Sequence, residues 1–97
     1  MISLSIHPEA SIEIKTAYHW YQRQVTGLGD DFLLELRTAH QAITIAPEAC
    51  PKFSQNCRRF LLSKFPFSVI YENNENTVFI IAIMHNSRKP KYWSERH

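Results

Sequence analysis

TVFIIAIMHNSRKPKYW, residues 77–93, is the stretch that decides the fold. Its first eight residues, 77–84, are apolar at nearly every position and rich in β-branched side chains. A half-buried strand would alternate apolar and polar residues, so this run predicts a strand covered on both faces, at or near the centre of a sheet. A buried helix is the competing interpretation, but the run is short and β-branched residues favour strands.

Basic and aromatic residues follow this strand directly, so it carries them to one end of the sheet; they are His85, Arg88, Lys89, Lys91, Tyr92 and Trp93. His85 has an ordinary pKa near neutrality, which suits a general acid or base, although a structural hydrogen bond is the commoner role. The cations suit a phosphate or a carboxylate, and Arg88 can hold two oxygens at once. Tyr92 and Trp93 can stack on bases or on a partner's side chains, but for Trp93 we favour packing of the C-terminus onto the sheet.

Two amphipathic helices are predicted upstream, because apolar residues recur there every three or four positions. The first helix runs from Glu9 to about Gln24. The second ends by Ala46, because Pro47 disfavours helical geometry in the residue before it. Joined by a short turn, the two helices form an antiparallel hairpin.

The turn between the helices is Thr26-Gly27-Leu28-Gly29. Gly27 suits a left-handed cap, and Asp30 or Asp31 is expected to cap the second helix. Glu13 is expected outside the apolar stripe of the first helix.

The remaining elements are strands, and the fold class is α+β. Residues 47–56 are expected to form a loop and 73–76 a turn. The strands, in addition to 77–84, are expected at 2–6, 58–63 and 67–72, with Phe67, Val69 and Tyr71 on one face. The order is β-α-α-β-β-β: a helical hairpin packed on a mostly antiparallel four-stranded sheet, forming a single domain over residues 1–97.

Composition narrows the function classes. No apolar run approaches the roughly 20 residues that span a bilayer, and the N-terminus does not resemble a signal peptide, so we expect a cytoplasmic protein without membrane contact. Cys50 and Cys57 are expected to be free thiols, although they can pair in an oxidising compartment. No metal-ligand spacing occurs, so neither a metal nor a cofactor is expected.

The two halves of the chain differ in charge. Residues 1–50 carry three Lys/Arg and six Asp/Glu, a net charge of −3, whereas residues 51–97 carry eight and three, a net charge of +5. This asymmetry suggests a basic face suited to an anionic partner, or a merely solvated basic surface. Arg58 and Arg59 open a strand, so their side chains point to opposite faces and one of them is a candidate for a binding surface.

Three segments resemble the toxins of the RelE/ParE superfamily. The helical hairpin carries A-x-x-WY-x-x-Q-x-x-GLG-x-x-F over residues 17–32, the next two strands carry RRFLLSKFPFSVIYE over 58–72, and the last strand carries IAIMHNSRKPKYW over 81–93. The resemblance implies the toxin of a bacterial plasmid-stabilisation toxin–antitoxin pair. It also implies a cognate antitoxin that binds the toxin in a hetero-oligomer.

The resemblance leaves the mechanism divided. RelE-like members cut mRNA on the ribosome without a metal, using arginines and a tyrosine or histidine, whereas ParE-like members block DNA gyrase. Ser68 stands here before Val69-Ile70-Tyr71, where the nucleases carry an arginine that stabilises charge on the phosphate. We therefore favour a ParE-like toxin that binds a protein target such as gyrase.

Two alternatives stay open. One is a ribosome-dependent mRNA endonuclease, with His85, Arg88 and Tyr92 as catalytic residues and Arg58 or Arg59 beside them. The other is a non-toxic relative that acts as a binding module. In the favoured reading, the target or anion-binding residues are Arg58, Arg59, Arg88, Lys89, Lys91 and Trp93.

Overall fold

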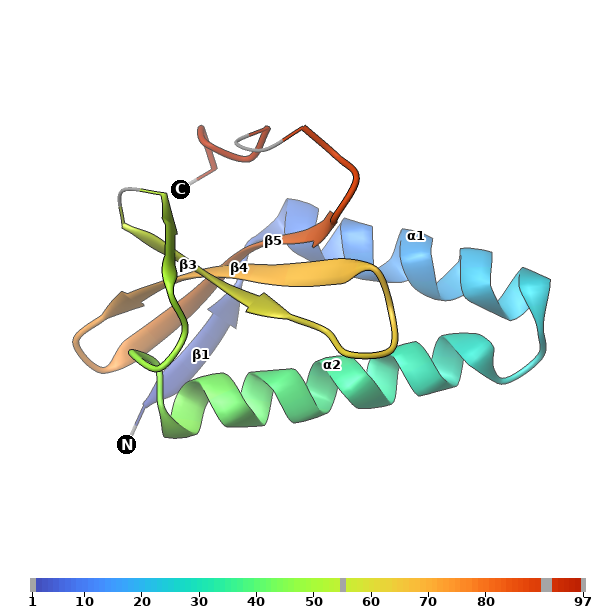
Figure 1. Cartoon of the computed structure of the whole chain (residues 1–97), viewed down its shortest axis with the longest axis horizontal. Coiled ribbons are helices and arrows are strands. Elements are labelled where there is room, and N and C mark those ends of the chain that lie inside the picture. The colour runs from blue at the N-terminus through green and yellow to red at the C-terminus, as the bar shows by residue number, and fades with distance from the viewer. Residues whose placement is uncertain (1, 55, 90–91, 97) are drawn as a thin grey trace.

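A five-stranded sheet with two helices on one face forms the molecule (Figure 1). The computed structural model describes residues 2–54, 56–89 and 92–96. Its elements, in chain order, are β1 (Ser3–Ile6), α1 (Pro8–Gln24), α2 (Leu28–Ile45), β2 (Lys52–Ser54), β3 (Cys57–Leu61), β4 (Phe67–Asn74) and β5 (Thr77–His85). The predicted α+β class and the order of the helices and longer strands are confirmed.

The sheet order is β1-β5-β4-β3-β2. β1 runs parallel to β5, and all other neighbours are antiparallel. The predicted count of four strands is wrong, because β2 lies inside the segment expected to be a loop. That strand is only three residues long and follows Pro51, so its sequence shows no alternation from which to detect it.

β5 is covered on both faces, as its continuous apolar run predicts. Val78, Ile80 and Ile83 face the helices, whereas Ile81, Ala82 and Met84 pack on the opposite side. The alternation breaks because Ile70 pairs with Ala82 while Tyr71 pairs with Ile80, which leaves Ile81 as the extra residue of a β-bulge.

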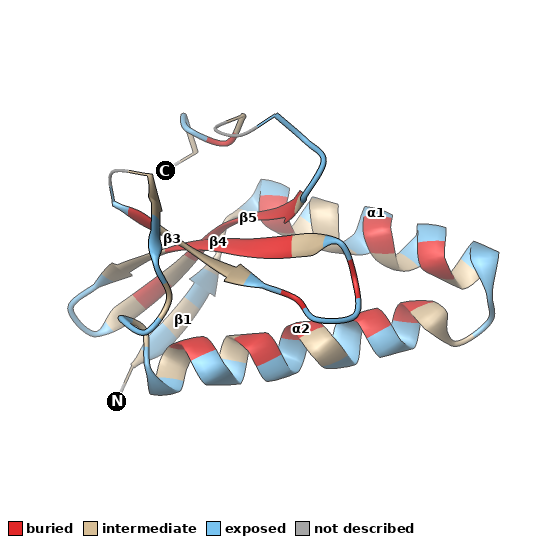
Figure 2. Ribbon diagram, viewed as in Figure 1, coloured by how far each residue is buried: buried red, intermediate tan, exposed pale blue. Residues whose placement is uncertain are grey.

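The helices turn their buried stripes toward the sheet (Figure 2). The predicted face of β4 is confirmed, because Val69 and Tyr71 are buried under the helices with Phe67 packed against them. Among the described residues, neither helix is apolar over enough of its length to cross a membrane.

The helical hairpin closes at Gly27, which has a φ of 92° and is the N-cap of α2. The left-handed conformation predicted for this glycine is confirmed. The prediction that Asp30 or Asp31 caps the helix is wrong, because α2 begins at Leu28 and both carboxylates lie in its first turn. There they face the positive end of the helix dipole.

The second face of the sheet is covered by the C-terminal segment, residues 92–96. Trp93 is 2% exposed and belongs to a cluster with Cys57, Ile70, Ile81, Ala82 and Met84. Its ring lies 6.2 Å from that of Phe53 in β2. Trp93 thus packs the C-terminus onto the sheet, and its ring offers no surface to a target or an anion in this arrangement.

Candidate functional site

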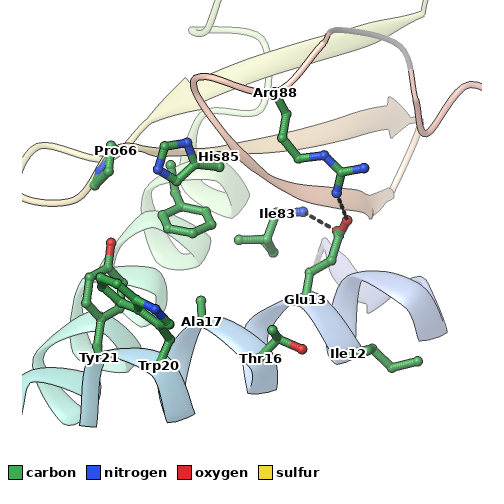
Figure 3. Close-up of a pocket in the computed structure, with 11 residues that line it drawn as sticks. Ile12, Glu13, Thr16, Ala17, Trp20, Tyr21, Pro66, Ile83, His85 and Arg88 are labelled. Atoms are coloured by element: carbon green, nitrogen blue, oxygen red, sulfur yellow. Dashed lines mark hydrogen bonds and ion pairs between the residues drawn. The ribbon is translucent and has the colours of Figure 1, made fainter. Parts of the chain in front are cut away.

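An apolar groove of about 730 Å³ lies between α1 and the ends of β4 and β5 (Figure 3). From the helix it is lined by Ile12, Glu13, Thr16, Ala17, Trp20 and Tyr21, and from the sheet side by Pro66, Phe67, Ile83, His85 and Arg88. Trp20 is 51% exposed and Ile12 is 60% exposed. Large apolar side chains that remain in water beside an apolar groove are typical of surfaces that bind another molecule.

The groove exists because β1 is shorter than β5. β1 pairs with β5 only from Ser3 to Ile6, and its last partner is Ile80. Beyond that point α1, rather than a strand, flanks β5. Since residues three or four positions apart share a helix face, Glu13, Ala17 and Trp20 all turn toward this end of the sheet.

Glu13 is the polar centre of this region. Its Oε1 accepts a hydrogen bond from the Ile83 N–H at 3.0 Å, which the end of β1 leaves without a strand partner. The same oxygen accepts a hydrogen bond from Nη1 of Arg96 at 2.9 Å. Its Oε2 accepts the Tyr92 hydroxyl at 2.7 Å and Nη2 of Arg96 at 3.1 Å. Glu13 is not among the buried residues of α1, in line with its expected place largely outside the apolar stripe, but its side chain is only 16% exposed.

Tyr92 is held as a proton donor. Burial, and next the hydrogen bond to Glu13, raise the pKa of its hydroxyl far above the ordinary value, although Arg88 and Arg96 nearby act in the opposite direction. The hydroxyl therefore stays protonated at neutral pH and donates its hydrogen bond to Glu13.

Arg88 stands at the mouth of the groove. Its guanidinium lies 3.7 Å from the centre of the Tyr92 ring, and its Nη1 is 4.0 Å from Oε2 of Glu13. The side chain is 54% exposed. Arg88 thus presents a cation to solvent from a fixed stacked position.

His85 lines the same groove. Its Nδ1 accepts the Ser87 N–H at 3.1 Å and lies 2.7 Å from the Ser87 hydroxyl. Its ring meets that of Phe67 edge-on, with 5.0 Å between the centres. These contacts orient the imidazole, and its Nδ1 is engaged by the backbone N–H of Ser87.

The two strand arginines point to opposite faces, as the strand geometry predicts. Nη1 of Arg58 donates to the carbonyls of Glu48 at 3.2 Å and Cys50 at 2.6 Å, so this arginine ties down the connection between α2 and β2. Nε of Arg59, on the other face, donates to the Ser68 hydroxyl at 2.9 Å.

Arg59 belongs to a small polar network. Its Nη2 donates to Oδ1 of Asn86 at 3.2 Å, and the Ser68 hydroxyl donates to the same oxygen at 2.6 Å. The guanidinium also lies 4.8 Å from the centre of the Phe53 ring. Although Ser68 is itself uncharged, a guanidinium from the neighbouring strand therefore lies against it.

The structure brings only part of the predicted set together. His85 and Arg88 share the groove, Tyr92 lies under Arg88 but does not line the groove, and Lys89 is exposed. Lys91 lies outside the described residues.

Sequence reasoning missed the residues that organise this region: Glu13, Trp20, Asn86 and Arg96. A signal for Glu13 was present, since it follows Ala10 by three positions and precedes Ala17 by four. A carboxylate at that spacing lies at the edge of the buried stripe and needs partners there.

The remaining candidates for chemistry are the two cysteine thiols and possible metal ligands. Cys50 and Cys57 are free, and burial, followed by the charge of Glu72, raises the pKa of Cys57 to about 11. In the part of the chain that the structure describes, no three His, Cys, Asp or Glu side chains gather in a way that would hold a metal ion.

Comparison with known proteins finds a matching family model and a solved structure with a similar fold. A family model described as the ParE toxin of the type II toxin–antitoxin system parDE matches residues 4–90. A solved structure titled as the chromosomal ParDE TA system from P. aeruginosa superposes with a TM-score of 0.76 at 17% identity, covering 88% of this chain and 96% of the other. Among curated proteins, no significant match was found.

Proposed function

Because this chain belongs to the ParE toxin family of type II toxin–antitoxin systems, we propose that it arrests growth in the cytoplasm by binding DNA gyrase until an antitoxin covers it. The observation that carries the proposal is one continuous surface, in which the exposed cations after β5, Arg88 and Lys89, adjoin the apolar groove. It suits a protein partner better than a small substrate, because Trp20 and Ile12 protrude into water along one side.

We assign the two partners to adjoining surfaces. The exposed cations after β5, Arg88 and Lys89, suit the target, and the groove suits a segment of the antitoxin. Arg88 belongs to both surfaces, so a bound antitoxin segment would cover a residue that the target needs. This overlap accounts for neutralisation by simple exclusion.

Induction of the protein in bacterial cells, with translation and plasmid supercoiling followed separately, tests the target. We expect growth to stop with loss of negative supercoiling before protein synthesis falls. Lys89→Glu should weaken the arrest, whereas the matched exchange Lys15→Glu, on exposed α1 surface, should not. Translation that fails first, with supercoiling intact, would reject gyrase as the target.

Trp20→Ala separates the antitoxin surface from the target surface. We expect this variant to arrest growth as the wild type does but to escape rescue by the antitoxin, because truncation of a buried interface tryptophan typically costs about 2–4 kcal/mol of binding. The antitoxin is sought in the neighbouring reading frame. Full rescue of Trp20→Ala would place the antitoxin elsewhere.

A second candidate is the ribosome-dependent mRNA endonuclease, and one observation favours it. Nε of Arg59 lies 2.9 Å from the Ser68 hydroxyl, so a guanidinium lies beside the position at which the RelE-like nucleases carry an arginine. Primer extension on translated message would then show codon-positioned cuts that are lost in His85→Ala, Arg88→Ala and Arg59→Ala. Uncut message during full growth arrest excludes this candidate.

A third outcome is a folded protein that causes no arrest at all. Such a result would make the chain a non-toxic binding module of the same family, with the groove retained as its binding surface.

A further inference from the structure

The groove and the C-terminal segment are connected through two charged residues. Glu13 and Arg88 line the groove, and both also contact Tyr92. Tyr92 and Arg96 belong to the C-terminal segment and do not line the groove. A change in the segment therefore reaches the groove through Glu13 and Arg88.

The carboxylate of Glu13 is satisfied without Arg88. Arg96 binds both of its oxygens, at 2.9 and 3.1 Å, and these two side chains are largely buried. Glu9 approaches Nε of Arg96 at 3.5 Å from the exposed side. At 4.0 Å from Glu13, Arg88 is beyond hydrogen-bond distance, so its donors remain available to a ligand.

Arg88 nevertheless has a defined position. Its guanidinium stacks 3.7 Å from the Tyr92 ring centre, and that ring is fixed by the 2.7 Å bond from its hydroxyl to Glu13. The docked segment thus holds a cation over the groove mouth before any ligand arrives. A group held in its bound position loses less entropy when the ligand binds.

We propose that the groove recognises an apolar segment bearing a carboxylate, that Arg88 binds this carboxylate, and that Tyr92 and Arg96 are positioning residues. Tyr92 stacks directly on Arg88, and Arg96 acts through Glu13, which holds the Tyr92 hydroxyl. The occupant is a stretch of the antitoxin with an acidic residue beside its apolar ones, an identity that rests on the proposed function. The charge of Arg88 and the apolar walls below it argue for this chemistry. By reciprocity, the occupant also stabilises docking of the C-terminal segment.

A pair of small probes tests the recognition: 1-naphthaleneacetate and its neutral amide, 1-naphthaleneacetamide, which share one apolar body. The two tryptophans of the chain report separately in NMR spectra, Trp20 from the groove and Trp93 from the segment. We expect both probes to shift the Trp20 indole signal and the acetate to bind about two- to fivefold more tightly than the amide.

Two variants outside the groove test the positioning. In Arg96→Gln and in Tyr92→Leu, the preference for the acetate should disappear while the affinity for the amide is kept. In Glu13→Gln, the simple effect of charge and the effect on positioning change the affinity for the acetate in opposite directions. Removal of a negative charge beside the groove would by itself strengthen binding of an anion, whereas loss of the anchor of Tyr92 and Arg96 should weaken it.

Arg88→Lys tests the same proposal if Arg96→Gln and Tyr92→Leu fail to fold. Lysine keeps the charge but not the flat guanidinium that stacks on Tyr92, so the preference should again be lost. Equal binding of the two probes by the wild type would overturn the proposal. So would a preference that survives in folded Arg96→Gln or in Arg88→Lys.

Neither the antitoxin nor gyrase enters this test. Its failure therefore leaves the proposed toxin function standing, and a failure of that function leaves the recognition chemistry standing.

Discussion

Gly27 and Gly29 lie two residues apart between α1 and α2, and each is needed for a different reason. Gly27 adopts a φ of 92°, which other residues rarely tolerate. Gly29 has ordinary backbone angles but no room, because a Cβ there would lie 2.6 Å from the Tyr18 carbonyl oxygen. Its N–H also donates to Oε1 of Gln22 at 2.7 Å, which joins the two helices.

Gly29→Ala should lower the free energy of unfolding by about 1–3 kcal/mol, since the helices must separate to admit the methyl group. Gly27→Asn is the matched control. Nothing lies within 4 Å of a Cβ at that position, and asparagine tolerates the left-handed conformation, so its cost should be smaller. Urea unfolding measures both, and an alanine at 29 that costs nothing contradicts the close packing.

His40 makes stability depend on pH. Burial lowers its pKa below the ordinary 6.5, and its Nε2 is buried without a hydrogen-bond partner among the described residues. Above pH 6.5 the ring is neutral in both states and its contribution is complete. As pH falls from 6.5 through the lower pKa of the folded state, the unfolded chain binds the proton more readily than the folded one, so stability is lost.

His40→Leu should therefore gain stability relative to the wild type as pH falls from 7 to 5. Leucine suits the site, because Leu4, Ile14 and Leu36 line the same hollow as His40. The measurement is urea unfolding of both proteins across this range. A difference between them that stays constant with pH would show that His40 does not titrate in this way.

At the scale of elements, periodicity predicts what is regular and long. The apolar run of β5 and the stripes of the two helices suffice to place the core on both sides of the sheet. β2 escapes prediction because three residues show no period. The role of Glu13 escapes it because the free N–H of Ile83 depends on where β1 stops, a tertiary fact that local spacing does not contain.

Trp93 is the apolar anchor of the C-terminal segment, and Trp93→Ala should cost about 3–5 kcal/mol of stability through the cavity that it leaves. Trp93→Phe should cost much less, because the indole N–H has no partner in the described structure to lose. Thermal unfolding followed by circular dichroism compares the two. An alanine variant as stable as the wild type would mean that the segment is not anchored by this ring.

At the scale of the whole molecule, the acidic N-terminal half meets the basic C-terminal half at Glu13. Arg96 and Tyr92 bind its carboxylate, which leaves Arg88 exposed above the groove. The sequence allowed a basic ending after β5 to be predicted. The groove beside it follows only from the packing of α1 against β5, with Trp20 left half in water.

The most direct test of a gyrase-binding toxin is a supercoiling assay with purified components. Relaxed plasmid, gyrase and ATP are mixed with the wild-type chain or with Lys89→Glu, and the topoisomers are separated on a gel. The wild type should block supercoiling at micromolar concentration, and the variant should need a higher one. Unimpaired supercoiling at a concentration of wild-type protein that arrests growth would contradict the proposed target.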